Sequence, residues 1–338
     1  MESSSEVAET SDSGGGRQRD TARQAIRPTC RVAVVIVHYR TPELLRDCIA
    51  SVLPEIDAQQ DLIIVVDNAS DDGSLELLRT ISGIVLIESN RNLGFAGANN
   101  LGVGHVQAER YLLLNPDTVA RPGALGTLME FLDSHPDAGM VGPRLEYPDG
   151  MAQLSAFGYP NPVGELLRGA AVGPLDRLLK RFNVIGPIGE QAHKADWLAG
   201  ACLLVRREIF DAVGLLDDHY FMYFEEVDFC RRAAAAGHTC WYLPAAHVVH
   251  LVGRASGIVS GKQQKRLPEY WFASRHRYFR RHYGYMGTIA ADALWLLGFG
   301  LMRLRTALTG AHQAYYADHE CSDFLRYESR LLRSPVAP

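Results

Sequence analysis

Short apolar runs alternate with helical patterns along residues 32–135, and this alternation constrains the fold more than any other feature. Runs such as "VAVVIVHY" (32–39) are continuous and rich in β-branched residues, which is typical of strands buried on both faces. The intervening segments repeat apolar residues at helical spacing. This pattern predicts an α/β fold with a mostly parallel sheet and helices on both faces. We expect strands at residues 32–39, 61–70, 83–89 and 110–115, and helices at 41–53, 72–82, 94–106 and 122–135.

Polar side chains follow two of these strands at the point where each strand ends. Asp67 and Asn68 end the second strand, and "NPD" (115–117) follows the fourth. The carboxyl ends of parallel strands share one edge of the sheet, where open α/β sheets bind their ligands. Taken alone, Asp117 could simply cap the next helix, because Asn-Pro-Asp is good turn chemistry. Beside Asp67, however, its carboxylate predicts a divalent metal ion that carries a diphosphate and relieves the repulsion.

Several classes of nucleotide-binding site are excluded by missing motifs. The chain has no G-x-x-x-x-G-K-[ST] loop, which argues against a P-loop NTPase. No G-x-G-x-x-G follows the first strand, which argues against a dinucleotide dehydrogenase. The glycine-rich stretch "NRNLGFAGANNLG" (90–102) follows the third strand instead, where it either contacts a ligand or starts a closely packed helix.

Composition limits the compartment and the partners. The net charge of −5 gives no sign of a nucleic-acid partner. The six cysteines include no Cys-x-x-Cys pair, so neither a zinc site nor a disulfide framework is indicated. Residues 1–30 are polar and lack the apolar core of a secretory signal, which predicts a disordered tail on a cytoplasmic protein.

Four motifs together resemble the family 2 glycosyltransferases, and in particular their rhamnosyltransferase-type branch. The motifs occur in that family's order and spacing: "VIVHYRTPELLRDCIASVL", "IIVVDNASDDGS", "NRNLGFAGANNLG" and "YLLLNPDT". The resemblance extends from about Val32 to about Gly257. It implies a Rossmann-like GT-A domain, which we assign to residues 31–260, and the transfer of a sugar from a nucleotide-diphosphate sugar.

The same resemblance implies a donor site. Tyr39 is expected along the base and ribose, and Asp67 is expected to accept from a ring nitrogen of the base. "NPD" matches the family's D-x-D motif, with Asn115 in place of its first aspartate. Asp117 would bind Mg²⁺ or Mn²⁺, and His250 fits a metal-binding histidine of the family better than His247. Further donor-binding residues are expected at Asn68, Gly94, Phe95, Asn99 and Asn115.

The segment "KADWLAGACLLVRREIFDAVGLLDDHYFMYFEEVDFCRRAAAAGH" (194–238) supplies the expected acceptor side. Gly200 and Ala201 resemble the family's acceptor-facing pair. Trp197 precedes them, although a tryptophan serves core packing more often than sugar binding.

Three carboxylates, Glu225, Glu226 and Asp228, are expected in the first turns of a helix within the same segment. There they could simply complement the positive helix end. By resemblance, Glu226 occupies the position of the catalytic base, with a side chain one methylene longer than the family's aspartate. Asp228 is expected to support the helix by pairing with Arg231 or Arg232.

Residues 261–338 predict a helical extension. The stretch 288–310 is apolar but contains Asp292 and is followed closely by basic residues, so it is poorly suited to span a membrane. It fits a helix at the membrane interface, on the inner face, or an ordinary packed helix hairpin.

We therefore expect an inverting glycosyltransferase of cell-envelope polysaccharide biosynthesis. The donor predicted by resemblance is dTDP-rhamnose, and the acceptor is a glycan or a lipid-linked glycan. Two alternatives remain at this point. One is a sugar-phosphate nucleotidyltransferase, although "HYRTPELL" lacks the glycine-rich loop expected there. The other is a non-catalytic sugar-binding scaffold with the same fold.

Overall fold

The computed structural model describes residues 29–171, 173–186, 188–252, 259–260, 263–264, 266–310, 317 and 319–333. The first strand begins at Thr29, and the rest of the predicted N-terminal tail lies outside the described residues. The tail is therefore not tested by the structure.

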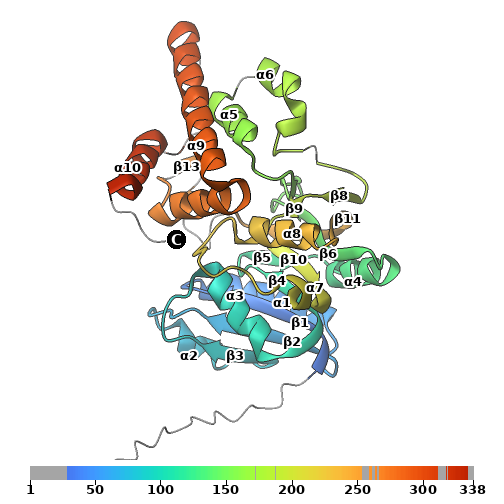
Figure 1. Ribbon diagram of the computed structural model, residues 1–338. Helices are drawn as coiled ribbons and strands as arrows, with labels where there is room; N and C mark the ends of the chain where they lie inside the picture. The colour runs from blue at the N-terminus through green and yellow to red at the C-terminus, as the bar shows by residue number, and fades with distance from the viewer. Residues whose placement is uncertain are drawn as a thin grey trace, which may run out of the picture.

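A nine-stranded mixed sheet forms the centre of the domain, with its strands in the order β3-β2-β1-β4-β10-β6-β11-β5 and β8 paired to β11 (Figure 1). Six strands run in one direction, and β10, β5 and β8 run against them. The strands are β1 (Thr29–His38), β2 (Asp61–Asp67), β3 (Ile84–Glu88), β4 (Gln107–Leu114), β5 (Thr118–Ala120), β6 (Ala138–Glu146), β8 (His193–Ala195), β10 (Cys202–Arg206) and β11 (Thr239–His250).

Helices cover both faces of this sheet, as predicted (Figure 1). Alternate side chains of β1 point into two separate cores, because successive residues of a strand face opposite sides. One core includes α1 and α4, and the other includes α3, α7 and α8. The helices of the domain are α1 (Pro42–Val52), α2 (Ser74–Leu78), α3 (Gly94–His105), α4 (Ala124–Ser134), α7 (Arg207–Val213) and α8 (Glu225–Ala235), with the short helix η1 (Leu53–Glu55).

Two reversed strands decide how the second half of the domain meets the first. β10 lies between β4 and β6 and is antiparallel to both. β5 pairs with the end of β11, so that Thr118 lies opposite His250. The direction of β10 could not be predicted from the sequence, because an apolar run buried on both faces has the same pattern in either direction.

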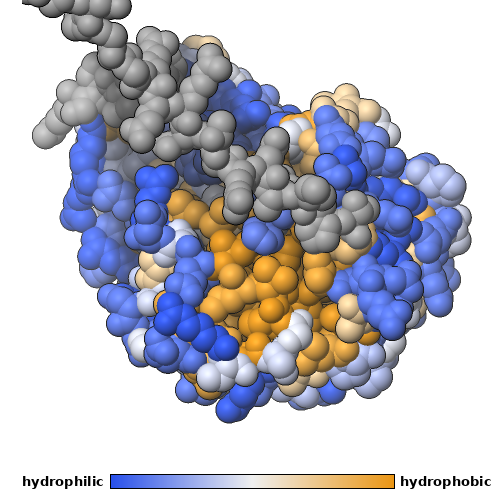
Figure 2. Space-filling model, turned by 90° about the horizontal axis from the view of Figure 1, so that it is seen from below, coloured by the Kyte–Doolittle hydropathy of each residue, from blue (hydrophilic) through white to orange (hydrophobic). Residues whose placement is uncertain are grey.

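The terminal strand β3 carries half-buried apolar side chains and has no partner on its outer side among the described strands. It lies at the bottom of Figure 1, and the view from below shows apolar side chains gathered across this face (Figure 2).

A helical unit follows the domain and packs beside it. Its main element is α9 (Glu269–Thr309), in which Gly284 is non-helical with φ of +68°. The predicted helical extension therefore consists mainly of α9, whose two parts meet at a kink at Gly284. The distal part extends away from the sheet beside α5 (Figure 1). The remaining elements are α5 (Pro162–Ala170), α6 (Gly173–Leu178), η2 (Lys180–Phe182), α10 (Glu320–Arg333), and the short strands β7 (Ala156–Phe157), β9 (Trp197–Leu198), β12 (Val259–Ser260) and β13 (Gln263–Gln264).

Close backbone contact joins the distal part of α9 to α5. A Cβ atom on Gly298 would meet the carbonyl oxygen of Leu166 at 2.5 Å, so only glycine fits there. Among the described helices, α9 alone is long and apolar enough to cross a membrane by length and composition, and 28% of its most apolar window is buried.

Candidate active site

The carboxyl ends of β1 and β2 place a buried carboxylate at the sheet edge. His38 and Asp67 are register partners, and Asp67 is 2% exposed. Asp67 Oδ2 accepts from the Ser70 backbone N–H, while Oδ1 has no hydrogen-bond partner among the described residues. His38 Nε2 lies 3.9 Å from that oxygen and 3.0 Å from Ser74 Oγ. Burial lowers the pKa of His38, which favours the neutral imidazole ring beside Asp67.

Tyr39 follows directly at the tip of β1. Its ring is partly exposed, and the Arg40 guanidinium lies 4.9 Å from the ring centroid. The predicted base contact of Tyr39 and the predicted ring-nitrogen contact of Asp67 are thus carried by neighbouring strand ends.

Asn68 and Asn99 hold the start of α3, where Phe95 lies. The Asn68 amide donates to the Gly94 carbonyl and accepts from the Leu93 N–H, which ties the start of this helix to the tip of β2. Asn99 donates to the Phe95 carbonyl over 2.9 Å. Both predicted donor-binding amides therefore use hydrogen bonds inside the protein.

Gly94 allows the start of α3 to approach the segment that precedes α8. Its φ is +71°, and a Cβ atom there would meet the carbonyl oxygen of Phe221 at 2.1 Å. The Phe95 N–H donates to that carbonyl over 2.7 Å. Gly94 is thus required for packing between the donor side and the acceptor side.

Asp117 and His250 lie side by side, as the predicted metal site requires. His250 Nε2 is 3.5 Å from Asp117 Oδ1, and Asp117 is 2% exposed. The contact follows from the register of β5 and β11 and from a hydrogen bond between the Leu251 N–H and the Asp117 carbonyl. His247, the other candidate, instead contacts Glu146 over 3.1 Å.

The donor atoms at this position fit a divalent ion. Carboxylate oxygen and imidazole nitrogen are ligands for Mg²⁺ and Mn²⁺, and imidazole favours manganese. Asn115 Oδ1 is buried nearby in the chain and has no hydrogen-bond partner among the described residues. These residues fit the implied ion.

The predicted acceptor pair, Gly200 and Ala201, connects Asn115 at the end of β4 to α8. The Asn115 N–H donates to the Ala201 carbonyl over 2.9 Å. A side chain at Gly200 would meet the Phe95 ring at 3.6 Å and Glu226 at 3.7 Å. The turn at Gly200 therefore lies between the start of α3, the "NPD" segment and the predicted base.

Helix α8 begins with two carboxylates, Glu225 and Glu226, in a strained setting. Tyr223 and Phe224, just before it, both have φ of +70°, which non-glycine residues rarely adopt. Such strain persists where the surrounding structure enforces it, often at active sites. Glu225 is 3% exposed, whereas Glu226 is partly exposed.

Burial changes the protonation of both carboxylates. Desolvation raises the pKa of Glu226 to about 7, although a backbone N–H of Gly200 opposes the rise. Desolvation and the neighbouring Glu226 raise the pKa of Glu225 well above its usual range. Because the two groups interact, these values belong to the pair. A carboxylate with a pKa near neutral pH suits a general base.

Asp228 anchors α8, as predicted, and the structure identifies its partners. Its carboxylate pairs with Arg232 over 2.7 Å, with His282 over 2.8 Å and with Arg281 over 3.2 Å. Arg231 does not take part in this cluster. Its guanidinium donates to Tyr278 Oη over 2.8 Å. Of the two predicted arginines, Arg232 is the partner of Asp228, because it lies one full turn further along the helix.

Trp197 is partly buried and already engaged. It stacks on Phe157 with ring centroids 4.3 Å apart, and its Nε1 donates to the Gly158 carbonyl. Trp197 also packs against two core clusters that include residues of α8, so the packing role considered from the sequence is satisfied.

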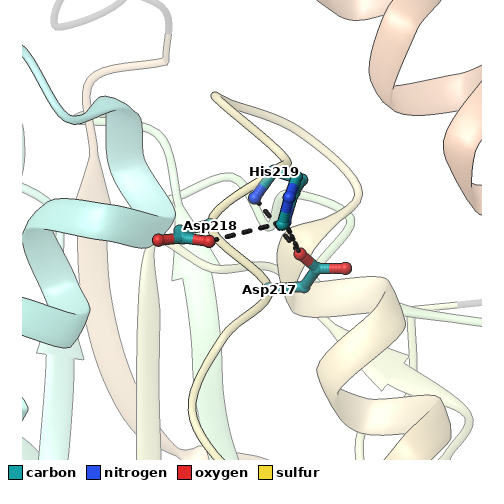
Figure 3. A group of neighbouring side chains, drawn as sticks. All are labelled: Asp217, Asp218 and His219. Carbon is teal, nitrogen blue, oxygen red and sulfur yellow. Dashed lines mark hydrogen bonds and ion pairs between the residues drawn. The ribbon is translucent and has the colours of Figure 1, made fainter. Parts of the chain in front are cut away.

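Three ligand-type side chains also gather before α8: Asp217, Asp218 and His219 (Figure 3). Asp217 already pairs with Arg277 and Arg281, which compensate its charge. Asp218 and His219 are exposed. We assign no ion to this cluster.

Comparison with known proteins identifies the family. Residues 33–214, more than half of the chain, match the family described as "Glycosyl transferase family 2". The chain belongs to this family. It is a glycosyltransferase, and the sequence prediction of its family is confirmed.

The relatives of this glycosyltransferase include enzymes named as rhamnosyltransferases. It is 30% identical to the N-acetylglucosaminyl-diphospho-decaprenol L-rhamnosyltransferase of Mycobacterium tuberculosis, over 58% of this chain and 68% of the relative. It is 27% identical to the rhamnosyltransferase WbbL of Escherichia coli K12, over 65% of this chain and 83% of the relative.

The fold is shared with a solved mannosyltransferase. PcManGT of Pyrobaculum calidifontis, solved in complex with GDP-Man and Mn²⁺, superposes with a TM-score of 0.53 at 16% identity, covering 91% of this chain and 82% of that one. The GT-A fold predicted from the sequence is thereby confirmed.

Proposed function

We propose that this glycosyltransferase is an inverting rhamnosyltransferase that uses dTDP-rhamnose and a glycan or lipid-linked acceptor. Two relatives support rhamnose as the transferred sugar, since both are named as rhamnosyltransferases, and the name of one includes a decaprenol-linked sugar, which supports a lipid-linked acceptor. The observation that carries the proposal is the arrangement around Gly200. This turn packs against Glu226, whose pKa is raised, and its neighbour Ala201 accepts from the N–H of Asn115, two residues before Asp117.

In the proposed reaction Glu226 removes the proton of an acceptor hydroxyl. The hydroxyl oxygen then forms a bond to the anomeric carbon while the bond from that carbon to the diphosphate breaks. The proton ends on Glu226, and the nucleoside diphosphate leaves. A single displacement of this kind inverts the anomeric configuration. A divalent ion held by Asp117 and His250 would supply charge stabilisation for the diphosphate.

Glu226 is favoured over Glu225 by its exposure. Glu225 is buried at 3% exposure, whereas Glu226 is partly exposed and packs against Gly200 at the acceptor turn. A base must lie within hydrogen-bonding reach of the hydroxyl that it deprotonates.

The apolar face of α9 supports peripheral membrane contact. From Met286 to Leu301 every exposed residue is apolar, and Met286 and Leu297 are 73% and 55% exposed. Arg303 follows as an exposed cation that suits anionic headgroups. We propose that this face lies on the inner surface of the membrane, where a lipid-linked acceptor would be presented.

Sedimentation with anionic liposomes tests the membrane contact. The double variant Leu297→Gln/Leu304→Gln should bind liposomes less than the parent, whereas Leu77→Gln, an exposed leucine on α2, should bind equally. If the double variant binds liposomes like the parent, the face is not a membrane surface. This holds also if the only change is in the sedimentation coefficient of the free protein, which would indicate contact between copies of the chain.

Donor turnover tests the function. Purified protein is incubated with dTDP-rhamnose, GDP-mannose, UDP-glucose and UDP-N-acetylglucosamine, with Mn²⁺, with Mg²⁺ and with EDTA. We expect metal-dependent hydrolysis or transfer chiefly with dTDP-rhamnose. If only another donor is turned over, dTDP-rhamnose is the wrong donor. If donors bind but none is turned over with any acceptor, a non-catalytic sugar-binding scaffold is favoured.

A further inference from the structure

We propose that Gln153 is a positioning residue that sets the tautomer of His250 and so presents Nε2 as a metal ligand. This inference rests on the proposed metal site. Gln153 lies after β6, is 6% exposed, and donates its backbone N–H to the Leu145 carbonyl over 2.8 Å. Its backbone is therefore fixed at the end of a central strand.

The side-chain amide of Gln153 contacts His250 at two points. Its Nε2 donates to the His250 carbonyl over 2.7 Å. Its Oε1 lies 3.3 Å from His250 Nδ1. A backbone carbonyl only accepts hydrogen bonds, so it must face the amide nitrogen, and the orientation of the amide follows from chemistry.

This orientation determines which ring nitrogen carries the proton. The amide oxygen can only accept, so the favourable partner at Nδ1 is an N–H group. In the neutral ring Nε2 then keeps its lone pair. That atom is the one 3.5 Å from Asp117 Oδ1. The two lone-pair-bearing atoms therefore face one position, as a shared ion requires.

Asp117 alone would favour the opposite tautomer. A carboxylate next to Nε2 attracts a proton to that nitrogen, and an Nε2–H group cannot bind an ion. The Gln153 amide opposes this effect from the other side of the ring. The backbone is held as well, since the Leu251 N–H donates to the Asp117 carbonyl. Hydrogen bonds of this kind to a metal-ligating histidine commonly contribute 10–100-fold in metal affinity.

Two variants separate the tautomer from the backbone contact. Gln153→Leu removes both hydrogen bonds at similar size. Gln153→Glu keeps an acceptor for Nδ1 and loses the donor to the carbonyl. Long-range ¹H–¹⁵N spectra of the metal-free protein report the His250 tautomer, and calorimetry with Mn²⁺ at saturating dTDP reports metal affinity. Circular dichroism confirms that both variants are folded.

We expect Gln153→Leu to shift His250 towards the Nε2–H tautomer and to lower Mn²⁺ affinity by about 10–100-fold. Gln153→Glu should keep the Nδ1–H tautomer and most of the affinity. An unchanged tautomer and affinity in Gln153→Leu would overturn the inference, and so would an equal loss in Gln153→Glu.

His250→Ala separates this inference from the metal site itself. If His250→Ala lowers Mn²⁺ affinity while Gln153→Leu does not, the metal site stands and the role of Gln153 is wrong. If His250→Ala leaves Mn²⁺ affinity unchanged, the metal site assigned under the proposed function fails, and the role of Gln153 fails with it.

Discussion

The proposed donor side and the proposed acceptor side of this glycosyltransferase are held in place by different means. On the donor side, Asp67 and Asp117 sit at or beside strand ends, and the register of β1, β2, β5 and β11 fixes their positions. On the acceptor side, Glu226 projects from α8, which is held by the charged contacts of Asp228 to Arg232 and to α9. A change in the sheet would disturb both sides, whereas a change in the Asp228 cluster should affect mainly the acceptor side.

The largest expected effect is that of Glu226→Gln on turnover. Glutamine keeps the shape of the side chain but cannot take a proton, so the rate should fall by roughly two to four orders of magnitude. Turnover is measured at saturating donor and acceptor. Glu225→Gln is the matched control and should lose much less. If the Glu226→Gln enzyme turns over as fast as the parent while the Glu225→Gln enzyme is folded but inactive, the assignment of Glu226 as the base is wrong.

The pH dependence of turnover should follow the same carboxylate pair. A base acts only when deprotonated, and burial raises the pKa of Glu226 to about 7. The rate should therefore rise as pH increases through about 7 and then level off. Rates at constant ionic strength from pH 5 to 9 give this profile. A rate that is flat across this range would exclude a base with a raised pKa.

Asp228→Asn should affect stability as well as rate. The buried carboxylate accepts from Arg232 and His282, and hydrogen bonds to charged groups contribute about 1.5–3 kcal/mol each in typical cases. We expect a loss of about 2 kcal/mol in the free energy of unfolding, measured with urea. Glu76→Gln, in an exposed pair with Arg79, is the control and should change little. Equal stability of both variants would show that the cluster does not anchor α8.

Glu225→Gln should have the smallest effect, and it should depend on pH. The folded pKa of the Glu225–Glu226 pair is raised, so the folded state holds protons more tightly than the unfolded state. The stability that the pair contributes is present below the ordinary carboxyl pKa and is lost as pH rises through the raised value. The melting temperature of Glu225→Gln relative to the parent should therefore be higher at pH 8 than at pH 5. Exposed Glu208→Gln should show no such trend.

The two sides also differ in how much could be predicted from the sequence. The strand tips follow from local patterns, because an apolar run ending in Asp67 or in Asn-Pro-Asp predicts both the strand and its end. The resemblance to the family then supplied the role of each side chain. The boundaries of α1, α3 and α4 were also predicted within a few residues.

The contacts that hold the acceptor side could not be predicted in the same way. His282 and Arg281 meet Asp228 only through the folding of α9 onto α8. Gln153 reaches His250 from an irregular segment, so no periodic pattern marks it. The direction of β10 was hidden because both of its faces are buried.

The metal-dependent binding of a nucleoside diphosphate tests the separation of the two sides most directly. Calorimetry with dTDP, with and without Mn²⁺, is applied to the parent, Asp117→Asn and Glu226→Gln. We predict that Glu226→Gln binds dTDP like the parent and that Asp117→Asn binds as the parent does without Mn²⁺, with both variants folded. Unchanged Mn²⁺-dependent affinity for dTDP in Asp117→Asn would contradict the assignment of the metal site. Loss of that affinity in Glu226→Gln would contradict the assignment of Glu226 as a base that does not hold the donor.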